Sequence, residues 1–253
     1  MTDTHAVDAT DEQVARFQAD GYLRIDRITS DGEVARLREL YDRVMADSRA
    51  FRVVYGGTET EEKVIDQVFL PELVAPEMGD SDYLRNGRRM VAQLLGVHED
   101  EVTPGGQMLI NKPATGGSEA PWHQDEAFWN DRNHLKSESV SVWMPLDEAV
   151  VESGCMQFLP GSHRNDVLRH RCEPGRPLVV DVPVDLSTAV ACPLPAGGAT
   201  FHHCRTLHHT APNTSGRPRR AITTIFHGPA AIRPVGLEKP WIRGLEVPSQ
   251  LPV

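Results

Sequence analysis

Two short windows of the sequence carry histidines and a carboxylate at spacings that suit a metal site. In the first window, PWHQDEAFW, His123 and Asp125 stand two residues apart. Side chains at positions i and i+2 of an extended segment point the same way, so this imidazole and this carboxylate are expected to converge. The triplet is weak alone, because a surface histidine beside an acceptor gives the same pattern.

The second window, FHHCRTLHHTAPNTSGRPRRAITTIF, holds four histidines and an arginine. Any of these histidines can complete a set of two histidines and one carboxylate, which leaves positions open on iron(II) for further ligands. Arg219 follows His208 by eleven residues, and its fork of donors suits a carboxylate. A metal triad followed by such an arginine predicts an organic acid that binds the same metal.

His203 and His208 compete for the role of third ligand. They are five residues apart, and an odd offset on a regular strand places two side chains on opposite faces. Only one of them is then expected to reach the metal, and the spacing to Arg219 favours His208. His202 and His203 are expected to be a strand pair, with one side chain satisfied and the other exposed. His203 remains a candidate contact for the substrate or for the organic acid.

The aromatic residues Phe128 and Trp129 follow Asp125 closely. Their position allows a substrate contact, although aromatic residues beside a barrel mouth also serve as core. No catalytic side chain beyond the metal ligands is expected.

Three helices are predicted before residue 100. Thr10 and Gln13 form a capping box for a helix over Asp11–Asp20, and Ser30 begins a second helix with apolar residues at helical spacing. A third helix is expected over Asp82–Leu95. The segment over residues 50–80 fits neither a helix nor a strand pattern.

From Thr103 onward, short β-prone runs alternate with turn residues, as in GGQMLINKP, SVSVWMPLDEA, GGATFHH and RRAITTIFHG. Such spacing predicts a sandwich or a barrel. We expect a single domain over residues 1–253, with a helical part at about residues 10–100 packed on a β core at about residues 103–230.

Composition excludes several classes of protein. The net charge is −10, and the basic residues do not cluster beyond Arg217, Arg219 and Arg220, which disfavours nucleic acids and the phosphates of a CoA thioester. Arg217 and Arg220 are expected to be solvated neighbours of Arg219 or a weak site for an acidic substrate. No apolar run approaches the roughly 20 residues of a membrane span. The four cysteines form no CxxC pair. The polar N-terminal stretch favours a cytoplasmic protein, and the oligomeric state stays open.

Taken together, the segments QMLINKP, WHQD, SGCMQFLPGSHR and LHHTAPNTSGRPRRA resemble the phytanoyl-CoA dioxygenase family. The similarity runs from RFQADGYLRI to RRAITTIF. It implies a mainly β fold with N-terminal helices, a double-stranded β-helix of the jelly-roll or cupin-like type. It also implies iron(II), 2-oxoglutarate and O2 as cofactor and cosubstrates. The implied reaction is hydroxylation of a small-molecule metabolite or natural-product intermediate, with release of succinate and CO2.

The resemblance also implies ligands position by position. His123, Asp125 and His208 match the family's metal ligands. Arg219 matches the arginine that binds the distal carboxylate of 2-oxoglutarate, and Thr210 matches the hydroxyl position that assists it.

Two further positions and one departure concern the pocket. Met108 and Trp143 match positions that line the cosubstrate pocket of the family. His209 stands where many members have glycine, which crowds the metal or offers a second donor.

Other reactions compete with hydroxylation. Cyclisation, desaturation and epimerisation on the same scaffold stay open. Halogenation is disfavoured because Asp125 occupies the place that chloride would need. A zinc or nickel hydrolase or isomerase would have no need of Arg219, and a non-catalytic barrel would need neither the triad nor the arginine.

Overall fold

The computed structural model describes residues 6–47, 49–55, 65–114, 117–129, 134–173, 178–233 and 236–244. Within them, three α-helices precede most of the strands: α1 (Asp11–Asp20), α2 (Asp31–Ala46) and α3 (Asp82–Leu95). None of the described helices is long and apolar enough to cross a membrane.

Side chains at the helix starts explain where these helices begin. Thr10 accepts a hydrogen bond from the backbone N–H of Gln13, whose side chain accepts one from the Thr10 N–H, so the predicted capping box is confirmed. Ser30 caps α2 by accepting from the Glu33 N–H. The Glu33 carboxylate, however, accepts from the Tyr83 N–H at the start of α3, at 3.2 Å. Glu33 thus links two helices.

The strands form two principal sheets in which every pairing is antiparallel. The larger sheet has the order β1 (Tyr22–Ile25), β12 (Ala199–His203), β7 (Ser139–Pro145), β14 (Arg219–His227), β4 (Thr103–Lys112), β3 (Ile65–Phe69), β2 (Phe51–Tyr55). The smaller sheet has the order β11 (Val190–Cys192), β8 (Met156–Phe158), β13 (His208–Thr210), β5 (Ala120–His123).

Short elements complete the described chain. Two strand pairs stand apart, β9 (His170–Arg171) with β10 (Val179–Val180) and β6 (Leu135–Lys136) with β15 (Ala231–Ile232). The 3-10 helices are η1 (Pro71–Leu73), η2 (Pro76–Gly79), η3 (Glu99–Glu101), η4 (Asp125–Phe128), η5 (Ser162–Arg164) and η6 (Pro240–Gly244).

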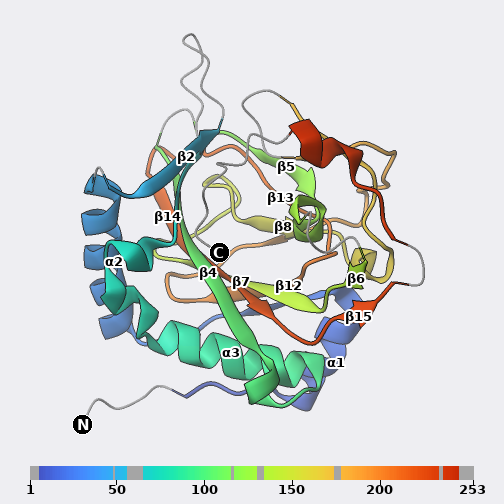
Figure 1. The fold of residues 1–253 in the computed structure, drawn as a ribbon. Coiled ribbons are helices and arrows are strands. Elements are labelled where there is room, and N and C mark those ends of the chain that lie inside the picture. Colours follow the sequence, from blue (N-terminus) through green and yellow to red (C-terminus); the bar gives the residue numbers. More distant parts are fainter. Residues whose placement is uncertain are drawn as a thin grey trace.

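The helices cover one face of the larger sheet, and the smaller sheet lies on the other side (Figure 1). One hydrophobic cluster joins the helices to that sheet; it includes Leu37, Met90, Leu109, Val142 and Phe226. A second cluster, which includes residues of β7 and β8, lies between the two sheets. The apolar residues of α2 and α3 therefore hold the sheet from outside, and its other face is left for a site.

Most sequence expectations on secondary structure are confirmed. The helices over Asp11–Asp20 and Asp82–Leu95 have the predicted bounds. The β-prone runs form β4, β7, β12 and β14. The ambiguous segment over residues 50–80 contributes β2 and β3 to an edge of the larger sheet, together with η1 and η2; its residues 56–64 lie outside the described part.

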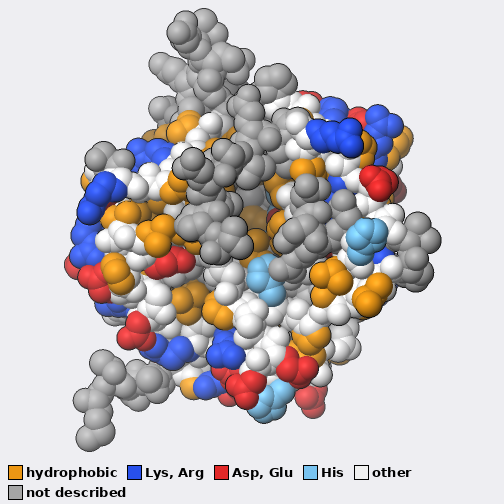
Figure 2. All heavy atoms as spheres, viewed as in Figure 1, with side chains coloured by type: hydrophobic (Ala, Val, Ile, Leu, Met, Phe, Trp, Pro, Cys, Tyr) orange, Lys and Arg blue, Asp and Glu red, His pale blue; other side chains and the backbone are white. Residues whose placement is uncertain are grey.

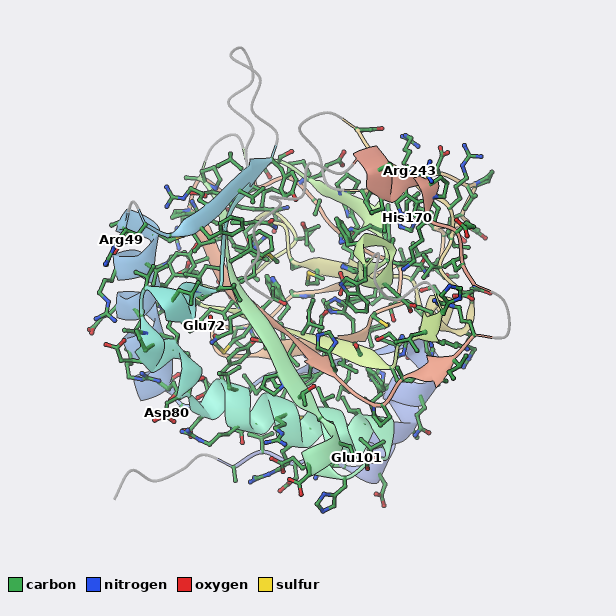
Figure 3. All side chains as sticks on the ribbon, in the orientation of Figure 1. Arg49, Glu72, Asp80, Glu101, His170 and Arg243 are labelled. Carbon is green, nitrogen blue, oxygen red and sulfur yellow. The ribbon has the colours of Figure 1, made fainter. Side chains whose placement is uncertain are left out.

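Charged side chains are distributed over the outside of the molecule. Figure 2 shows basic and acidic side chains interspersed on one face. In Figure 3, the exposed Arg49, Asp80 and Glu101 lie at the edge of the molecule, whereas His170 lies inside its outline. Unlike these three exposed residues, the buried His170 makes its contacts inside the fold.

Candidate metal centre and cosubstrate pocket

A cavity of about 120 Å3 lies between the two sheets. Its walls come from β3, β4, β7, β12 and β14 of the larger sheet and from β5, β8 and β13 of the smaller one. His123, Asp125, His208, Arg219 and Thr210 all line it. The residues that sequence reasoning connected with metal and organic acid therefore share one space.

Strand pairing brings the three candidate metal ligands together. His123 ends β5 and lies directly opposite His208, which begins β13. The two-residue spacing predicts that Asp125 continues the strand of His123. Instead, Asp125 begins the 3-10 helix η4. The intervening Gln124 is fully buried and bonds to the backbone of Leu168 and Arg205, so it faces away from the triad.

The ligand atoms of the triad face one another. The Asp125 Oδ1 atom lies 3.4 Å from the His208 Nε2 atom and 3.9 Å from the His123 Nε2 atom. One ligand atom from each of the three residues lies within 4.8 Å of the other two. These separations suit a single ion held between them.

Backbone carbonyls fix which nitrogen of each imidazole faces the centre. The His123 Nδ1 atom lies 2.6 Å from the Pro121 carbonyl oxygen, and the His208 Nδ1 atom lies 2.9 Å from the Thr206 carbonyl oxygen. A carbonyl only accepts, so each Nδ1 carries the hydrogen and each Nε2 presents a lone pair. Two lone pairs and a carboxylate oxygen thus converge with no donor between them.

The electrostatics of the triad fit one bound cation. Burial raises the pKa of Asp125, but His208 and His202 lower it further, so the net pKa lies well below its ordinary value. Burial and the neighbouring His208 lower the pKa of His123 to about 3. For His208, burial lowers the pKa and Asp125 raises it more. The two imidazoles compete for one positive charge, and two nitrogens plus one carboxylate are a donor set that iron(II) accepts.

Arg219, the first residue of β14, is a buried cation that forms no ion pair with any residue that the structure describes. Its side chain is 1% exposed, and its Nε and Nη1 atoms have no hydrogen-bonding partner among the described residues. Its guanidinium lies 5.2 Å from the centre of the Trp143 ring, and burial lowers its pKa to about 10. A buried charge that lacks a partner is costly, so the cavity is built to receive an anion at this end.

Lys112 places a second basic side chain at the same end, directly opposite Arg219 across β4 and β14. Its Nζ atom donates to the Thr210 Oγ1 atom at 2.7 Å and to the backbone carbonyls of Thr210 and Ala211. Burial and then the charge of Arg219 lower the pKa of Lys112 to about 6. Because the Thr210 hydroxyl accepts from Lys112, its own hydrogen is available for an anion.

The other residues named from the sequence separate into two groups. Met108 and Trp143 line the cavity, as expected. Phe128 and Trp129 do not line it: the Phe128 ring meets the His123 ring edge-on at 5.7 Å, and the Trp129 ring meets that of His227 at 5.8 Å. Their contact with substrate stays a prediction.

His203 belongs to a different set of contacts from the triad. Its Nε2 atom lies 2.9 Å from the Glu138 carboxylate, and its Nδ1 atom accepts from the Arg205 N–H. Neither ring nitrogen faces the cavity lining. Its suggested contact with substrate gains no support from this geometry.

Ser141 and His202 line the cavity and approach the Asp125 carboxylate. Of the histidine pair His202 and His203, it is His202 that faces inward, which a strand pattern alone does not show. Sequence reasoning missed two other polar residues, Ser141 and Lys112. For Lys112, the polar residue at the end of the apolar run QMLIN was a usable signal.

His170 supports the segment that carries His123 and Asp125. Its Nε2 atom accepts from the Gln124 N–H at 3.2 Å, and its Nδ1 atom lies 2.8 Å from the Leu168 carbonyl oxygen. It thereby fixes the backbone between His123 and Asp125. Nothing in the sequence near residue 170 indicates this.

The basic residues beside Arg219 differ from each other. Arg217 is exposed, as expected for a solvated neighbour. Arg220 is not, because it forms ion pairs with Asp147 at 2.8 Å and with Asp42 at 3.0 Å. It ties α2 to the start of β14.

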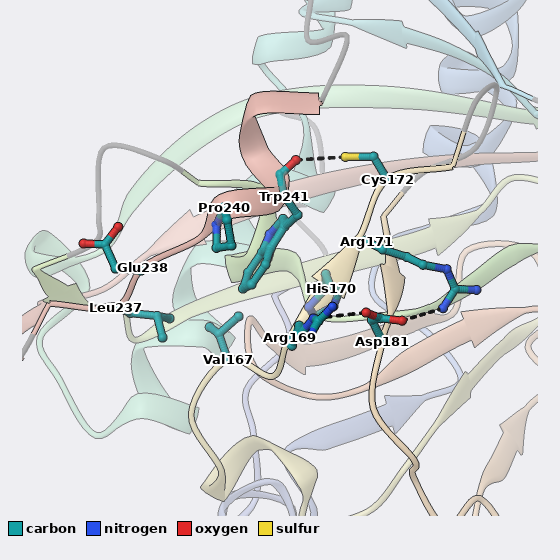
Figure 4. Close-up of a pocket in the computed structure, with 10 residues that line it drawn as sticks. All are labelled: Val167, Arg169, His170, Arg171, Cys172, Asp181, Leu237, Glu238, Pro240 and Trp241. Atoms are coloured by element: carbon teal, nitrogen blue, oxygen red, sulfur yellow. Dashed lines mark hydrogen bonds and ion pairs between the residues drawn. The ribbon is translucent and has the colours of Figure 1, made fainter.

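A wider groove of about 690 Å3 lies beside η6 (Figure 4). Its charged residues are largely paired, because Asp181 forms ion pairs with both Arg169 and Arg171. Trp241 and Val167 supply apolar wall, and His170 is buried at its base. The groove lacks the triad and the unpaired cation, so the chemistry belongs to the smaller cavity.

The sequence is similar to that of known proteins. The family model of phytanoyl-CoA dioxygenase (PhyH) matches residues 17–221. L-proline trans-4-hydroxylase of Streptomyces griseoviridis is 26% identical over 242 residues, which are 84% of this chain and 84% of that protein.

Solved structures agree as well. EvdO2 from Micromonospora carbonacea var. aurantiaca, complexed with 2-oxoglutarate, is 33% identical with a TM-score of 0.79 and covers 92% of this chain and 97% of its own. The epimerase SnoN, in complex with Fe3+, alpha ketoglutarate and nogalamycin RO, is 24% identical with a TM-score of 0.68, over 88% and 86% of the two chains; this likeness concerns the fold. The expected jelly-roll fold with N-terminal helices is confirmed.

Proposed function

The chain belongs to the phytanoyl-CoA dioxygenase family and is an iron- and 2-oxoglutarate-dependent oxygenase, and we propose that it hydroxylates a small-molecule metabolite or natural-product intermediate. In this proposal, His123, Asp125 and His208 hold iron(II). Support comes from the two Nε2 lone pairs and the Oδ1 atom that face one another.

The observation that carries the proposal is the unpaired Arg219 in the same cavity as the triad. We infer that Arg219 binds the distal carboxylate of 2-oxoglutarate and that Thr210 donates its hydroxyl hydrogen to it. Met108 and Trp143 then form walls of this pocket. A guanidinium matches a carboxylate with two parallel hydrogen bonds, which also sets the direction of the bound acid.

When bound, iron with 2-oxoglutarate and O2 supplies the oxidising power, and the cosubstrate leaves as succinate and CO2. The protein supplies orientation and a dry space. Backbone carbonyls hold the two imidazoles in one tautomer, and His170 holds the backbone between His123 and Asp125. Burial of Arg219 keeps water from competing for its carboxylate.

The substrate is proposed to be small and not a CoA thioester. Support comes from the net charge of −10 and from relatives named for small substrates, such as L-proline trans-4-hydroxylase. Phosphates favour a cluster of basic side chains, whereas basic and acidic side chains occur together on the face that Figure 2 shows. We further propose a single domain, supported by the hydrophobic cluster that joins the helices to the larger sheet.

The experiment is a panel of candidate metabolites screened for succinate formation with iron(II), 2-oxoglutarate and air. A substrate should raise succinate formation above its basal rate and gain one oxygen atom by mass. A product that has lost two hydrogens would indicate desaturation or cyclisation instead of hydroxylation. A product of unchanged mass and inverted configuration would indicate epimerisation. A protein that binds iron(II) but turns over no 2-oxoglutarate with any of the panel would count against the proposal.

A further inference from the structure

Three imidazoles surround the Asp125 carboxylate, and they divide its two oxygens between them. His123 and His208 approach Oδ1, at 3.9 and 3.4 Å. His202 approaches the other oxygen, Oδ2, at 3.3 Å. The Ser141 hydroxyl also reaches Oδ2, at 2.5 Å. One oxygen therefore faces the proposed metal position, and the other faces two protein groups.

His202 presents the opposite ring chemistry from the two proposed metal ligands. Its Nδ1 atom has no hydrogen-bonding partner among the described residues, whereas those of His123 and His208 meet backbone carbonyls. A carboxylate oxygen only accepts, so the His202 Nε2 atom must carry a hydrogen to bond to it. His202 is then a donor to Asp125 and presents no lone pair to a metal on that side.

His202 and Ser141 are direct cross-strand neighbours. They are partners in the register of β12 and β7, two adjacent strands of the larger sheet. Each is 3% exposed, and both line the cavity. The Phe158 ring lies 5.3 Å from the His202 ring and restrains it. The sheet itself therefore sets the spacing of two donors that meet at one oxygen.

We propose that His202 and Ser141 are positioning residues that hold the Oδ2 atom of Asp125, so that this carboxylate binds the metal through Oδ1 alone. This inference rests on the proposed function. A carboxylate that is free to rotate can bind through both oxygens and occupy a second metal position. Held by two donors, Asp125 leaves that position open for the cosubstrate, O2 or substrate.

The test uses cobalt(II) as a probe, because its visible absorption reports the number and geometry of its ligands without turnover. The variants are His202→Phe, which keeps the ring shape without a donor, His202→Gln, which restores an N–H donor, and Ser141→Ala. His98→Gln is the matched control, since His98 is 77% exposed and distant in sequence from these residues. Thermal unfolding of the metal-free variants checks that each one folds.

Loss of either donor should weaken cobalt(II) binding by about 10- to 100-fold, the usual effect of removing a group that holds a metal ligand. The absorption spectrum should also change, because Asp125 can then bind through both oxygens. His202→Gln should restore affinity and spectrum, and His98→Gln should match the parent. Because Ser141→Ala removes only one oxygen atom, it tests the idea even if His202→Phe does not fold.

Two outcomes would overturn the inference. In one, His202→Phe or Ser141→Ala binds cobalt(II) with the affinity and spectrum of the parent. In the other, His202→Phe loses the metal while Ser141→Ala is unaffected, which would make His202 a ligand itself. The variant His123→Ala distinguishes failure of this inference from failure of the proposed function. If His123→Ala also binds cobalt(II) with parental affinity, the metal triad is wrong. If only His123→Ala loses the metal, the triad is right and only the positioning role of His202 and Ser141 is wrong.

Discussion

Two regions of the molecule bury arginine side chains, and they treat the charge in opposite ways. Within η4, Glu126 is fully buried between Arg205, at 3.1 Å, and Arg233, at 2.6 Å. In the cavity, Arg219 is equally buried but has Nε and Nη1 atoms without partners among the described residues. The first region is complete without a ligand, and the second is not.

The difference separates structure from function. Glu126 follows Asp125 directly in the chain, and its partners Arg205 and Arg233 come from segments far away in sequence. Lys239 adds a hydrogen bond to the Glu126 carbonyl oxygen at 2.8 Å. The paired cluster therefore anchors the segment that carries Asp125, the proposed metal-binding carboxylate. In our proposal, the unpaired guanidinium lowers the stability of the empty protein, and an anion that binds to it gains affinity.

The largest difference is expected between His208, which lines the cavity, and His203, which contacts Glu138 and the backbone of Arg205. His208→Ala should abolish iron(II) binding and turnover with little loss of fold, because it removes one of the two Nε2 lone pairs. His203→Ala should instead lower the free energy of unfolding, because it strips Glu138 of a partner, and should retain bound metal. Metal content and thermal unfolding are measured on both variants. Metal retained by His208→Ala and lost by His203→Ala would reverse the assignment of the third ligand.

The next effect concerns the paired cluster. Glu126→Gln should lower the free energy of unfolding by about 1.5 to 3 kcal/mol, because Arg205 and Arg233 lose the buried carboxylate that they share and keep only the more exposed Glu138 and Asp166 as countercharges. Urea denaturation of metal-free protein measures this. Glu152→Gln is a control with an exposed carboxylate and should change stability little. A Glu126→Gln variant as stable as the parent would remove the distinction between the two regions.

A smaller effect is expected on acidification. Burial raises the pKa of Glu138, but its bonds to His203 and Arg205 lower it more, from 4.5 to about 2. A lowered folded-state pKa stabilises the fold above the unfolded-state value, and this contribution is lost as pH falls from about 4.5 towards 2. Glu138→Gln should therefore be less stable than the parent at pH 7, with the difference narrowing through that window. Denaturant midpoints at pH 7, 4 and 3 check this, and a constant difference would contradict it.

The sequence predicted the elements best where the signals were local. The capping residues Thr10 and Ser30 and the apolar spacing of α2 and α3 act within a few residues, so three helices were predicted, α1 and α3 with their bounds. The pairing of β5 with β13 was not predicted, but the two windows it joins were. The proposed metal and cosubstrate residues could be named for that reason.

The remainder depended on contacts between distant segments. Whether His202 or His203 faces Asp125 follows from the register of β12 on β7, which no local pattern contains. Arg220 was expected to be solvated and is not, because Asp42 of α2 and Asp147 both reach it. Whether a charged side chain has a partner depends on contacts in the folded chain. This holds for the paired Arg220 and for the unpaired Arg219.

The central claim is that the unpaired guanidinium of Arg219 is the binding group for 2-oxoglutarate. It is tested most directly by equilibrium titration of 2-oxoglutarate, without O2 and with iron(II) present, into the parent, Arg219→Ala and Arg217→Ala. Charge-assisted hydrogen bonds of this kind contribute about 1.5 to 3 kcal/mol, so Arg219→Ala should bind 2-oxoglutarate about 10- to 100-fold more weakly. Its iron content should be unchanged, and Arg217→Ala should titrate like the parent. If Arg219→Ala binds 2-oxoglutarate with parental affinity, the buried cation serves some other purpose and the account of the cavity is wrong.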